Sequence, residues 1–224
     1  LDSLGRWCSY CNYRTEHFKY STMPLTYSGN PPQPCVWNLQ SHAEYLQELG
    51  KRLHGQGKIF IANGVHANRV MLGFSCDVMG GEGTPGYEAG EGFYALRVAA
   101  GVKPYCLLNA SHRVSPRLWN SCLYMGYLMG CNTDKGFADE AKSLPVIIKL
   151  NEAAWHPVPY ARATPTVIGI ERWGGRTADT PLFFTMMNRS PDPVAIEARV
   201  DLAAMGRSGK VRASALPSEL RLQV

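Results

Sequence analysis

Hydrophobic and polar positions recur with a helical period in some segments and form short apolar runs in others. In SHAEYLQELGKRLHGQG, leucines recur at helical spacing, Ser41 and Glu44 have the spacing of a capping box, and a glycine ends the pattern. The run KIFIANG that follows is rich in apolar residues and ends in Asn-Gly, which predicts a strand over 58–63. Helix, glycine and strand in this order form half of an α/β unit.

The same alternation continues to about residue 155. Apolar runs predict strands over 74–78 and 104–109, while GEGFYALRVAAG, SPRLWNSCLYMGYLMG and SLPVIIKLNEAAW predict helices. The last two begin with serine followed closely by proline, which is typical of a helix start. Strands that alternate with helices of this length predict a parallel sheet with crossover connections.

A different pattern begins near residue 165. TVIGIERWG, PLFFTMMNRS and PVAIEARVDL are strand-like runs separated by turn residues, with no helical segment between them. Such runs predict an antiparallel meander. We therefore expect a helix-and-strand domain over 1–164 and part of an antiparallel, sandwich-like β-domain over 165–224.

The first residues, LDSLG, have the pattern of the carboxyl end of a strand. Together with the runs at 58–63, 74–78 and 104–109 they give four strands of the βα type, whereas a closed (β/α)8 barrel has eight. The simplest account is a partial barrel, strands 4–8, with the N-terminal half of the barrel outside this chain. We expect residues 1–224 alone to be inactive.

Composition and charge exclude several classes of function. The net charge of +5 is modest and the basic residues are dispersed, which argues against nucleic acid as a partner. No apolar run approaches the roughly 20 residues that span a bilayer. Cys8 and Cys11 form a single C-x-x-C, with His17 and Cys35 downstream, but a second pair of zinc ligands at regular spacing is absent. We expect no metal and no cofactor.

Polar residues stand where each predicted strand ends. They are Asp2, Asn63, Asp77 with the nearby Glu82, and Asn109. In parallel α/β folds the ligand binds at the carboxyl ends of the strands, where the βα loops converge. Turn and cap formation accounts for part of this pattern. The four positions together indicate a binding or catalytic site.

Aromatic residues accompany these strand-end acids. Trp7, Tyr10 and Trp37 lie within the segment 5–40, which we expect to be a long loop. Loops of this length are usually lids or binding loops. Flat aromatic faces beside carboxylates suit sugar rings, so we expect these rings to bind substrate, with packing of a lid as the alternative. His112 follows the strand at 104–109 and is a further candidate for substrate contact.

The order LDSLG, LGKRLHGQGKIFIANG, CDVMGGEG, AAGVKPYCLLN and ERWGG…PLFFTMMNRS resembles the C-terminal half of a (β/α)8-barrel glycoside hydrolase. It is similar to α-glycosidase-type barrels, including relatives of the endo-α-N-acetylgalactosaminidases, in which a β-domain follows the barrel. The resemblance is one of pattern and order over most of the chain. It implies an oligosaccharide or polysaccharide as the substrate.

Carried over by position, the resemblance makes Asp2 the strand-4 carboxylate and the nucleophile. Asp77 or Glu82 becomes the acid/base, and Asn63 holds substrate hydroxyls. Asp77 is nearer the predicted strand end, whereas Glu82 has the longer side chain and lies among glycines, which favours it slightly. One carboxylate must stay ionised while the other holds a proton for the leaving oxygen.

With the resemblance, these residues predict a glycoside hydrolase, one that retains anomeric configuration if Asp2 is the nucleophile. A non-catalytic carbohydrate-binding or scaffold protein on the same barrel is the alternative. A metal-dependent hydrolase of polysaccharide substituents is less favoured, because the chain has no H-x-H or H-E-x-x-H pair.

Overall fold

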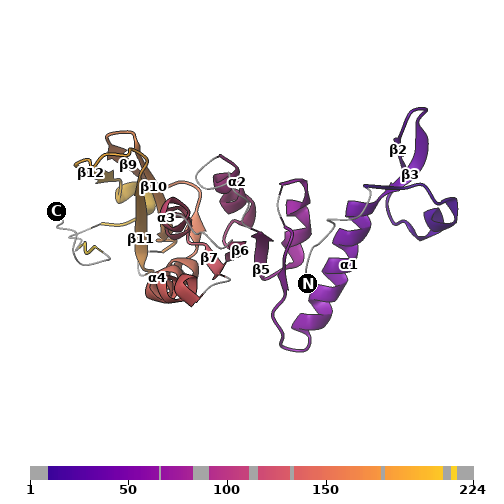
Figure 1. The fold of residues 1–224 in the computed structure, drawn as a ribbon, viewed down its shortest axis with the longest axis horizontal. Coiled ribbons are helices and arrows are strands. Elements are labelled where there is room, and N and C mark those ends of the chain that lie inside the picture. The colour runs from indigo at the N-terminus through magenta and orange to yellow at the C-terminus, as the bar shows by residue number, and fades with distance from the viewer. Residues whose placement is uncertain are drawn as a thin grey trace.

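Four short strands form a parallel sheet in the middle of the structure (Figure 1). In the computed structural model, which describes residues 10–65, 67–82, 91–110, 116–131, 134–177, 180–208 and 213–215, these strands are β4 (Ile61–Ala62), β5 (Val78–Glu82), β6 (Tyr105–Ala110) and β7 (Leu128–Cys131). They pair in chain order, each parallel to the next. The predicted α/β class with a parallel sheet is confirmed. Within the described residues the sheet is open, with β4 and β7 at its edges, so a closed barrel is not shown.

Helices connect the strands and supply the rest of the core. They are α1 (Asn38–His54), the 3-10 helix η2 (Ala67–Ser75), α2 (Glu91–Ala100), α3 (Pro116–Met125) and α4 (Asp134–Ala153). The main core gathers buried side chains from α1, η2, the sheet, α2 and α3, including Leu46, Leu72, Met79, Tyr105 and Tyr127. None of the described helices is both long enough and apolar enough to span a membrane.

The prediction of a strand over 74–78 is wrong. The apolar run before it is the 3-10 helix η2, which buries Leu72 while Phe74 stays 65% exposed. The strand is instead the glycine-rich segment VMGGE of β5. A Cβ on Gly80 would lie 2.7 Å from the carbonyl oxygen of Ala62, so a glycine is needed for β5 to lie this close to β4.

Helix boundaries also differ from the sequence pattern. The apolar segment after Pro116 is not helical throughout, because α3 ends at Met125 and β7 begins at Leu128. In α4 the helix starts at Asp134, nine residues before the predicted serine start, and contains Pro145 in its interior. Likewise α1 begins at Asn38 without a side-chain cap, so the predicted capping box does not form.

The segment predicted as a long loop contains a small sheet in its described part. Strands β1 (Cys11–Asn12), β2 (Thr26–Ser28) and β3 (Gln33–Trp37) form an antiparallel sheet in the order β1-β3-β2, with the 3-10 helix η1 (Thr15–Tyr20) between β1 and β2. We call residues 10–37 the N-terminal unit. Figure 1 shows β2 and β3 at the N-terminal end of α1, away from the parallel sheet.

The C-terminal strands are antiparallel, as predicted. They are β8 (Trp155–His156), β9 (Ala161–Thr164), β10 (Ile168–Gly174), β11 (Leu182–Asn188) and β12 (Glu197–Val200), followed by the 3-10 helix η3 (Ala203–Met205). β10 pairs with β11 and β8, while β12 pairs with β9 rather than with β11. Strands on both sides of residues 164/165 therefore pair with one another.

Candidate functional site

Asn63 and Glu82 meet at the carboxyl edge of the parallel sheet. Asn63 directly follows β4 and Glu82 is the last residue of β5. The Asn63 amide Nδ2 donates a hydrogen bond of 3.2 Å to Oε1 of Glu82. Its own Oδ1 accepts the backbone N–H of Gly64 at 2.7 Å, which fixes the orientation of the amide. The structure thus brings together two of the residues that the sequence pattern indicated.

Glu82 stands beside a buried amide at the carboxyl end of the sheet. Asn63 is buried, at 5% exposure, whereas Glu82 is half-buried at the end of its strand. Past β4 the chain stays beside β5, where the backbone N–H of Val65 donates to the carbonyl of Gly80 at 2.8 Å. A half-buried carboxyl group held by an amide at a strand end can exchange a proton with a ligand above the sheet.

The next strand brings Asn109 to the same edge. Glu82 is paired with Leu108 on β6, so Asn109 is the next residue along the neighbouring strand. The side chain of Asn109 lies outside the described part of the structure, as do Asp2, Trp7 and His112. The roles predicted for these four residues stay predictions.

Asp77 lies at the opposite edge of the sheet. It directly precedes β5 instead of ending a strand, because the strand begins at Val78. At about 3.3 Å per residue, five residues of extended chain separate Asp77 from Glu82 by roughly 16 Å. Two carboxyl groups this far apart cannot both belong to one glycosidase site, where the two lie roughly 5–9.5 Å apart. If the site is at the carboxyl edge of this sheet, Glu82 belongs to it and Asp77 does not.

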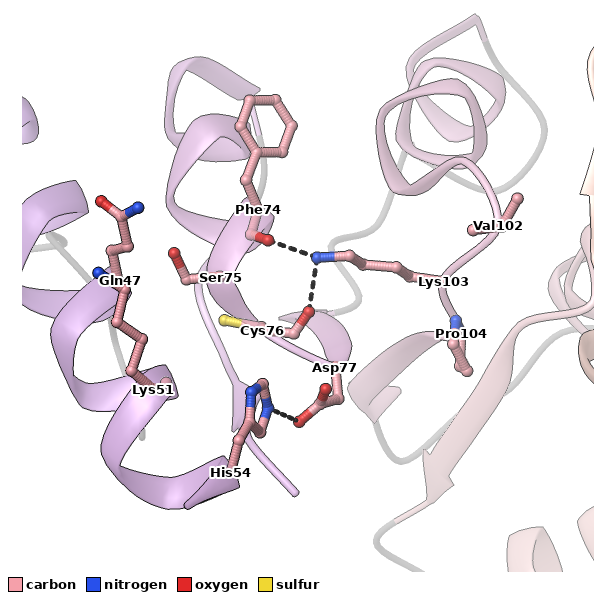
Figure 2. A pocket seen from close by; sticks show the side chains of 11 residues that line it. Gln47, Lys51, His54, Phe74, Ser75, Cys76, Asp77, Val102, Lys103 and Pro104 are labelled. Atoms are coloured by element: carbon pink, nitrogen blue, oxygen red, sulfur yellow. Dashed lines mark hydrogen bonds and ion pairs between the residues drawn. The ribbon is translucent and has the colours of Figure 1, made fainter. Parts of the chain in front are cut away.

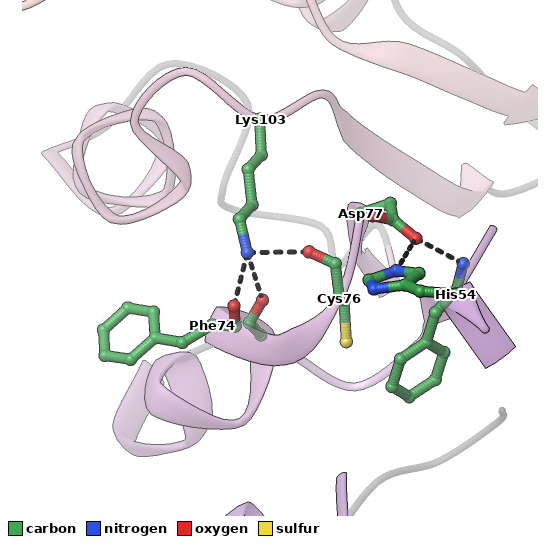
Figure 3. Close-up of polar contacts among 7 residues, drawn as sticks. His54, Phe74, Cys76, Asp77 and Lys103 are labelled. Atoms are coloured by element: carbon green, nitrogen blue, oxygen red, sulfur yellow. Dashed lines mark hydrogen bonds and ion pairs between the residues drawn. The ribbon is translucent and has the colours of Figure 1, made fainter. Parts of the chain in front are cut away.

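Asp77 instead joins the end of α1 to the start of β5 (Figure 3). Its Oδ2 accepts the backbone N–H of Phe60 at 2.7 Å and lies 2.9 Å from Nε2 of His54. The hydrogen bond with His54 is the main reason that the pKa of Asp77 is lowered from its ordinary value.

An open cavity of about 530 Å³ lies at this amino edge, between α1, η2 and the turn before β6 (Figure 2). Lys103 extends from that turn and donates through Nζ to the carbonyls of Gly73 (3.2 Å), Phe74 (2.6 Å) and Cys76 (2.7 Å). All three N–H donors of the ammonium group are matched by carbonyls at the end of η2. The cation therefore caps the end of η2 and fixes it to the sheet. These contacts give Lys103 a structural role at the amino edge.

The predicted aromatic residues lie on the N-terminal unit. Tyr10 precedes β1 and Trp37 ends β3, and they are 47% and 43% exposed. Tyr20 and Tyr27 on the same unit are more exposed still. Tyr20 borders a cavity of about 290 Å³ whose other lining residues are mostly polar: Asn12, His17, Ser21, Val36 and Ser41. Aromatic and polar side chains are thus available for a ligand here, on a different element from Glu82.

A buried polar cluster was not indicated by the sequence. Glu171 on β10 accepts hydrogen bonds from Nε1 of Trp155 (2.9 Å) and from the hydroxyl of Tyr124 (3.1 Å). Burial raises the pKa of Glu171 above its ordinary value, and these two donors oppose the shift. Arg172, its neighbour, lies over the ring of Tyr160 at 5.0 Å instead. The only sign of this cluster in the sequence is an acid, Glu171, within the otherwise largely apolar run that forms β10.

Among the described residues, no three His, Cys, Asp or Glu side chains gather as a metal site. Comparisons of the chain with protein-family models, with curated proteins and with solved structures found no match. Among the described residues, the carboxyl edge of the parallel sheet is the best-supported candidate site.

Proposed function

We propose that this chain carries part of the active site of a glycoside hydrolase that acts on an oligosaccharide or polysaccharide. The observation that carries the proposal is Glu82 at the carboxyl end of β5, hydrogen-bonded to Asn63 at the end of the adjacent strand. In parallel α/β folds this edge is where ligands bind. The chain-order pairing of β4 to β7 fits strands 5 to 8 of a (β/α)8 barrel.

In this mechanism Glu82 is the acid/base. It would protonate the leaving glycosidic oxygen and later accept a proton from the attacking water. Asn63 orients the carboxyl group through Nδ2 without adding a charge to the site. The resemblance assigns the nucleophile to Asp2, which makes the reaction retaining. The exposed rings of Tyr10 and Trp37 would contact outer sugar units.

The assignment is tested with Glu82→Gln in the protein at its natural length, on a panel of 4-nitrophenyl and alkyl α-glycosides. Loss of the general acid lowers kcat/KM by about 10³-fold on the poor alkyl leaving groups and less on 4-nitrophenol. Asp77→Asn is the matched control, because it changes a carboxylate of the same sheet at the edge away from the site. We expect it to retain activity.

Two further results would decide between mechanisms. Proton NMR of the first-formed sugar should show the configuration of the substrate, and Asp2→Asn should abolish turnover. Equal losses from Asp77→Asn and Glu82→Gln would contradict the assignment of Glu82.

A non-catalytic carbohydrate-binding protein is the second candidate, favoured by the exposed Tyr20 at the polar cavity of the N-terminal unit. It predicts that oligosaccharides bind, as measured by calorimetry, while no α-glycoside is cleaved. Tyr20→Ala would then weaken binding, because a stacking platform is lost, and Glu82→Gln would leave it unchanged.

A further inference from the structure

One face of the sheet in the N-terminal unit forms the floor of its cavity of about 290 Å³. The register pairs Asn12 on β1 with Val36 on β3, so the two side chains lie on the same face. Val36 is buried and supplies an apolar surface. The walls are formed by the residues at and after η1 and near the start of α1: His17, Tyr20, Ser21 and Ser41.

A pair of polar side chains in this cavity is held in one arrangement. Oδ1 of Asn12 accepts the backbone N–H of Arg14 at 3.1 Å, and Nδ2 of Asn12 lies 2.9 Å from Nδ1 of His17. Because an amide nitrogen only donates, Nδ1 of His17 accepts, and the proton of the neutral imidazole is on Nε2. Within the described part of the chain, this Nε2–H has no hydrogen-bond partner, so it is available to a ligand.

Two serines add hydroxyl groups, and the lining carries no acid or fixed cation. Oγ of Ser21 donates to the carbonyl of Met23 at 2.8 Å, so it can only accept from a ligand. Ser41 is exposed and makes no hydrogen bond to another residue that the structure describes. The lining residues include no Asp, Glu, Lys or Arg. The cavity therefore suits an uncharged ligand that both donates and accepts hydrogen bonds.

Tyr20 places an aromatic ring at the rim of the cavity. Its side chain is 73% exposed, and Nζ of Lys19 lies 4.9 Å from the centroid of its ring. The apolar C–H face of a sugar packs on such a ring, while the sugar hydroxyls need donors and acceptors. The volume is at the lower limit of small-molecule sites, roughly 300–1,000 Å³, which suits one sugar unit.

We propose that this cavity binds one uncharged sugar unit, stacked on Tyr20 and hydrogen-bonded to Nε2 of His17 and to the hydroxyls of Ser21 and Ser41. The proposal rests on the proposed function for the class of ligand, and it adds a second sugar site away from Glu82. In the glycoside hydrolase this site would hold a long substrate without contacting the bond that is cleaved.

The test is saturation-transfer difference NMR on the protein at its natural length. The probes are methyl glycosides of neutral hexoses and N-acetylhexosamines at millimolar concentration, with methyl glucuronide as the charged comparison. At least one neutral probe should give a signal that exceeds that of the glucuronide. The signal should be lost in Tyr20→Ala, and His17→Phe should weaken binding about tenfold, because the Nε2–H is removed.

Tyr27→Ala is the matched control, because Tyr27 is similarly exposed, at 69%, but lies on β2 outside the cavity. It should bind the probe as the wild type does. No signal from any neutral probe, or equal losses in Tyr20→Ala and Tyr27→Ala, would overturn the proposal. A dimer that Tyr20→Ala dissociates in analytical ultracentrifugation would overturn it as well, since the ring would then pack against another copy of the chain.

A further pair of measurements separates this site from the catalytic one. Glu82→Gln should bind the neutral probe as the wild type does, so binding without cleavage of any glycoside would contradict the hydrolase and leave the sugar site standing. In an active enzyme, Tyr20→Ala should raise KM for a long substrate and leave kcat/KM on 4-nitrophenyl glycosides unchanged. A loss on the 4-nitrophenyl substrates would place Tyr20 in the catalytic site and contradict a separate sugar site.

Discussion

At the scale of single residues, the two acidic side chains that flank β5 have different environments and different roles. Glu82 follows the strand, is half-buried and contacts the amide of a neighbouring strand end. Asp77 precedes the strand and contacts a backbone N–H and a histidine. The first arrangement lies at the edge where ligands bind in parallel sheets, and the second joins α1 to β5 at the opposite edge. This contrast makes Asp77→Asn informative for stability as well as for activity.

Asp77 should contribute stability that depends on pH. Its pKa is lower in the folded protein than its ordinary value of 3.8, so its contribution is present above pH 3.8 and is lost as the pH falls through the folded pKa. Because Asp77 and His54 are 38% and 50% exposed, we expect Asp77→Asn to cost at most about 1 kcal/mol at neutral pH.

The measurement is urea unfolding of both proteins between pH 2.5 and 6. The difference between wild type and Asp77→Asn should shrink as the pH is lowered below 3.8. A difference that grows on acidification would mean that the contact with His54 does not stabilise the folded state.

At the scale of elements, a single glycine decides where α3 ends. Gly126 has a φ of +61°, and the backbone N–H of Tyr127 donates to the carbonyl of Cys122, which closes the helix end. The side chain of Trp173 packs directly against this glycine, since a Cβ there would lie 2.4 Å from the ring. The apolar pattern continues through this point, which is why it predicts one unbroken helix.

Gly126→Ala should therefore destabilise the protein by about 3 kcal/mol, from left-handed backbone strain and overpacking against Trp173. Gly101 is a matched control, because it also has a positive φ, +57°, but open space where a Cβ would be. Gly101→Ala should cost only about 1 kcal/mol. Chemical denaturation compares the two, and equal losses would show that the contact with Trp173 contributes nothing.

Sequence patterns identified two strands of the parallel sheet, misplaced β5 and predicted β7 as the end of a helix. The run at 58–63 contains β4, and the run at 104–109 nearly coincides with β6. β5 was missed because two of its five residues are glycines, which are poor strand formers on their own. Gly80 is needed there because β4 lies so close, and that contact exists only after the sheet has formed.

At the scale of the whole molecule, a buried arginine links the two hydrophobic cores. Arg97 on α2 is fully buried, and its guanidinium lies 5.6–5.9 Å from the ring centroids of Tyr127, Trp155 and Trp173. Tyr127 belongs to the main core, while the two tryptophans belong to the smaller core around α4 and β10. Its Nη2 also donates to the carbonyls of Gly101 and Lys103.

Arg97→Met should lower the free energy of unfolding by about 3 kcal/mol, because the half-buried carbonyls of Gly101 and Lys103 lose their donor and the rings lose the cation. Burial lowers the pKa of Arg97 to about 10, so the wild-type side chain is charged at neutral pH.

We also expect tryptophan fluorescence and far-UV circular dichroism to report separate unfolding transitions in Arg97→Met. Arg52→Met, at an exposed position of α1, should change stability by less than about 0.5 kcal/mol. Coincident transitions in Arg97→Met would show that the cores unfold together without this link.

The sequence by itself determined the alternation of helices and strands, the parallel and antiparallel halves, and the strand-end position of Asn63. Hydrophobic periodicity and turn residues report local geometry, so they suffice for these features. Only the tertiary structure decided that Glu82 contacts Asn63 while Asp77 contacts His54. Those contacts depend on strand register and on which end of a strand a residue occupies. A strand boundary that moves by a few residues changes both.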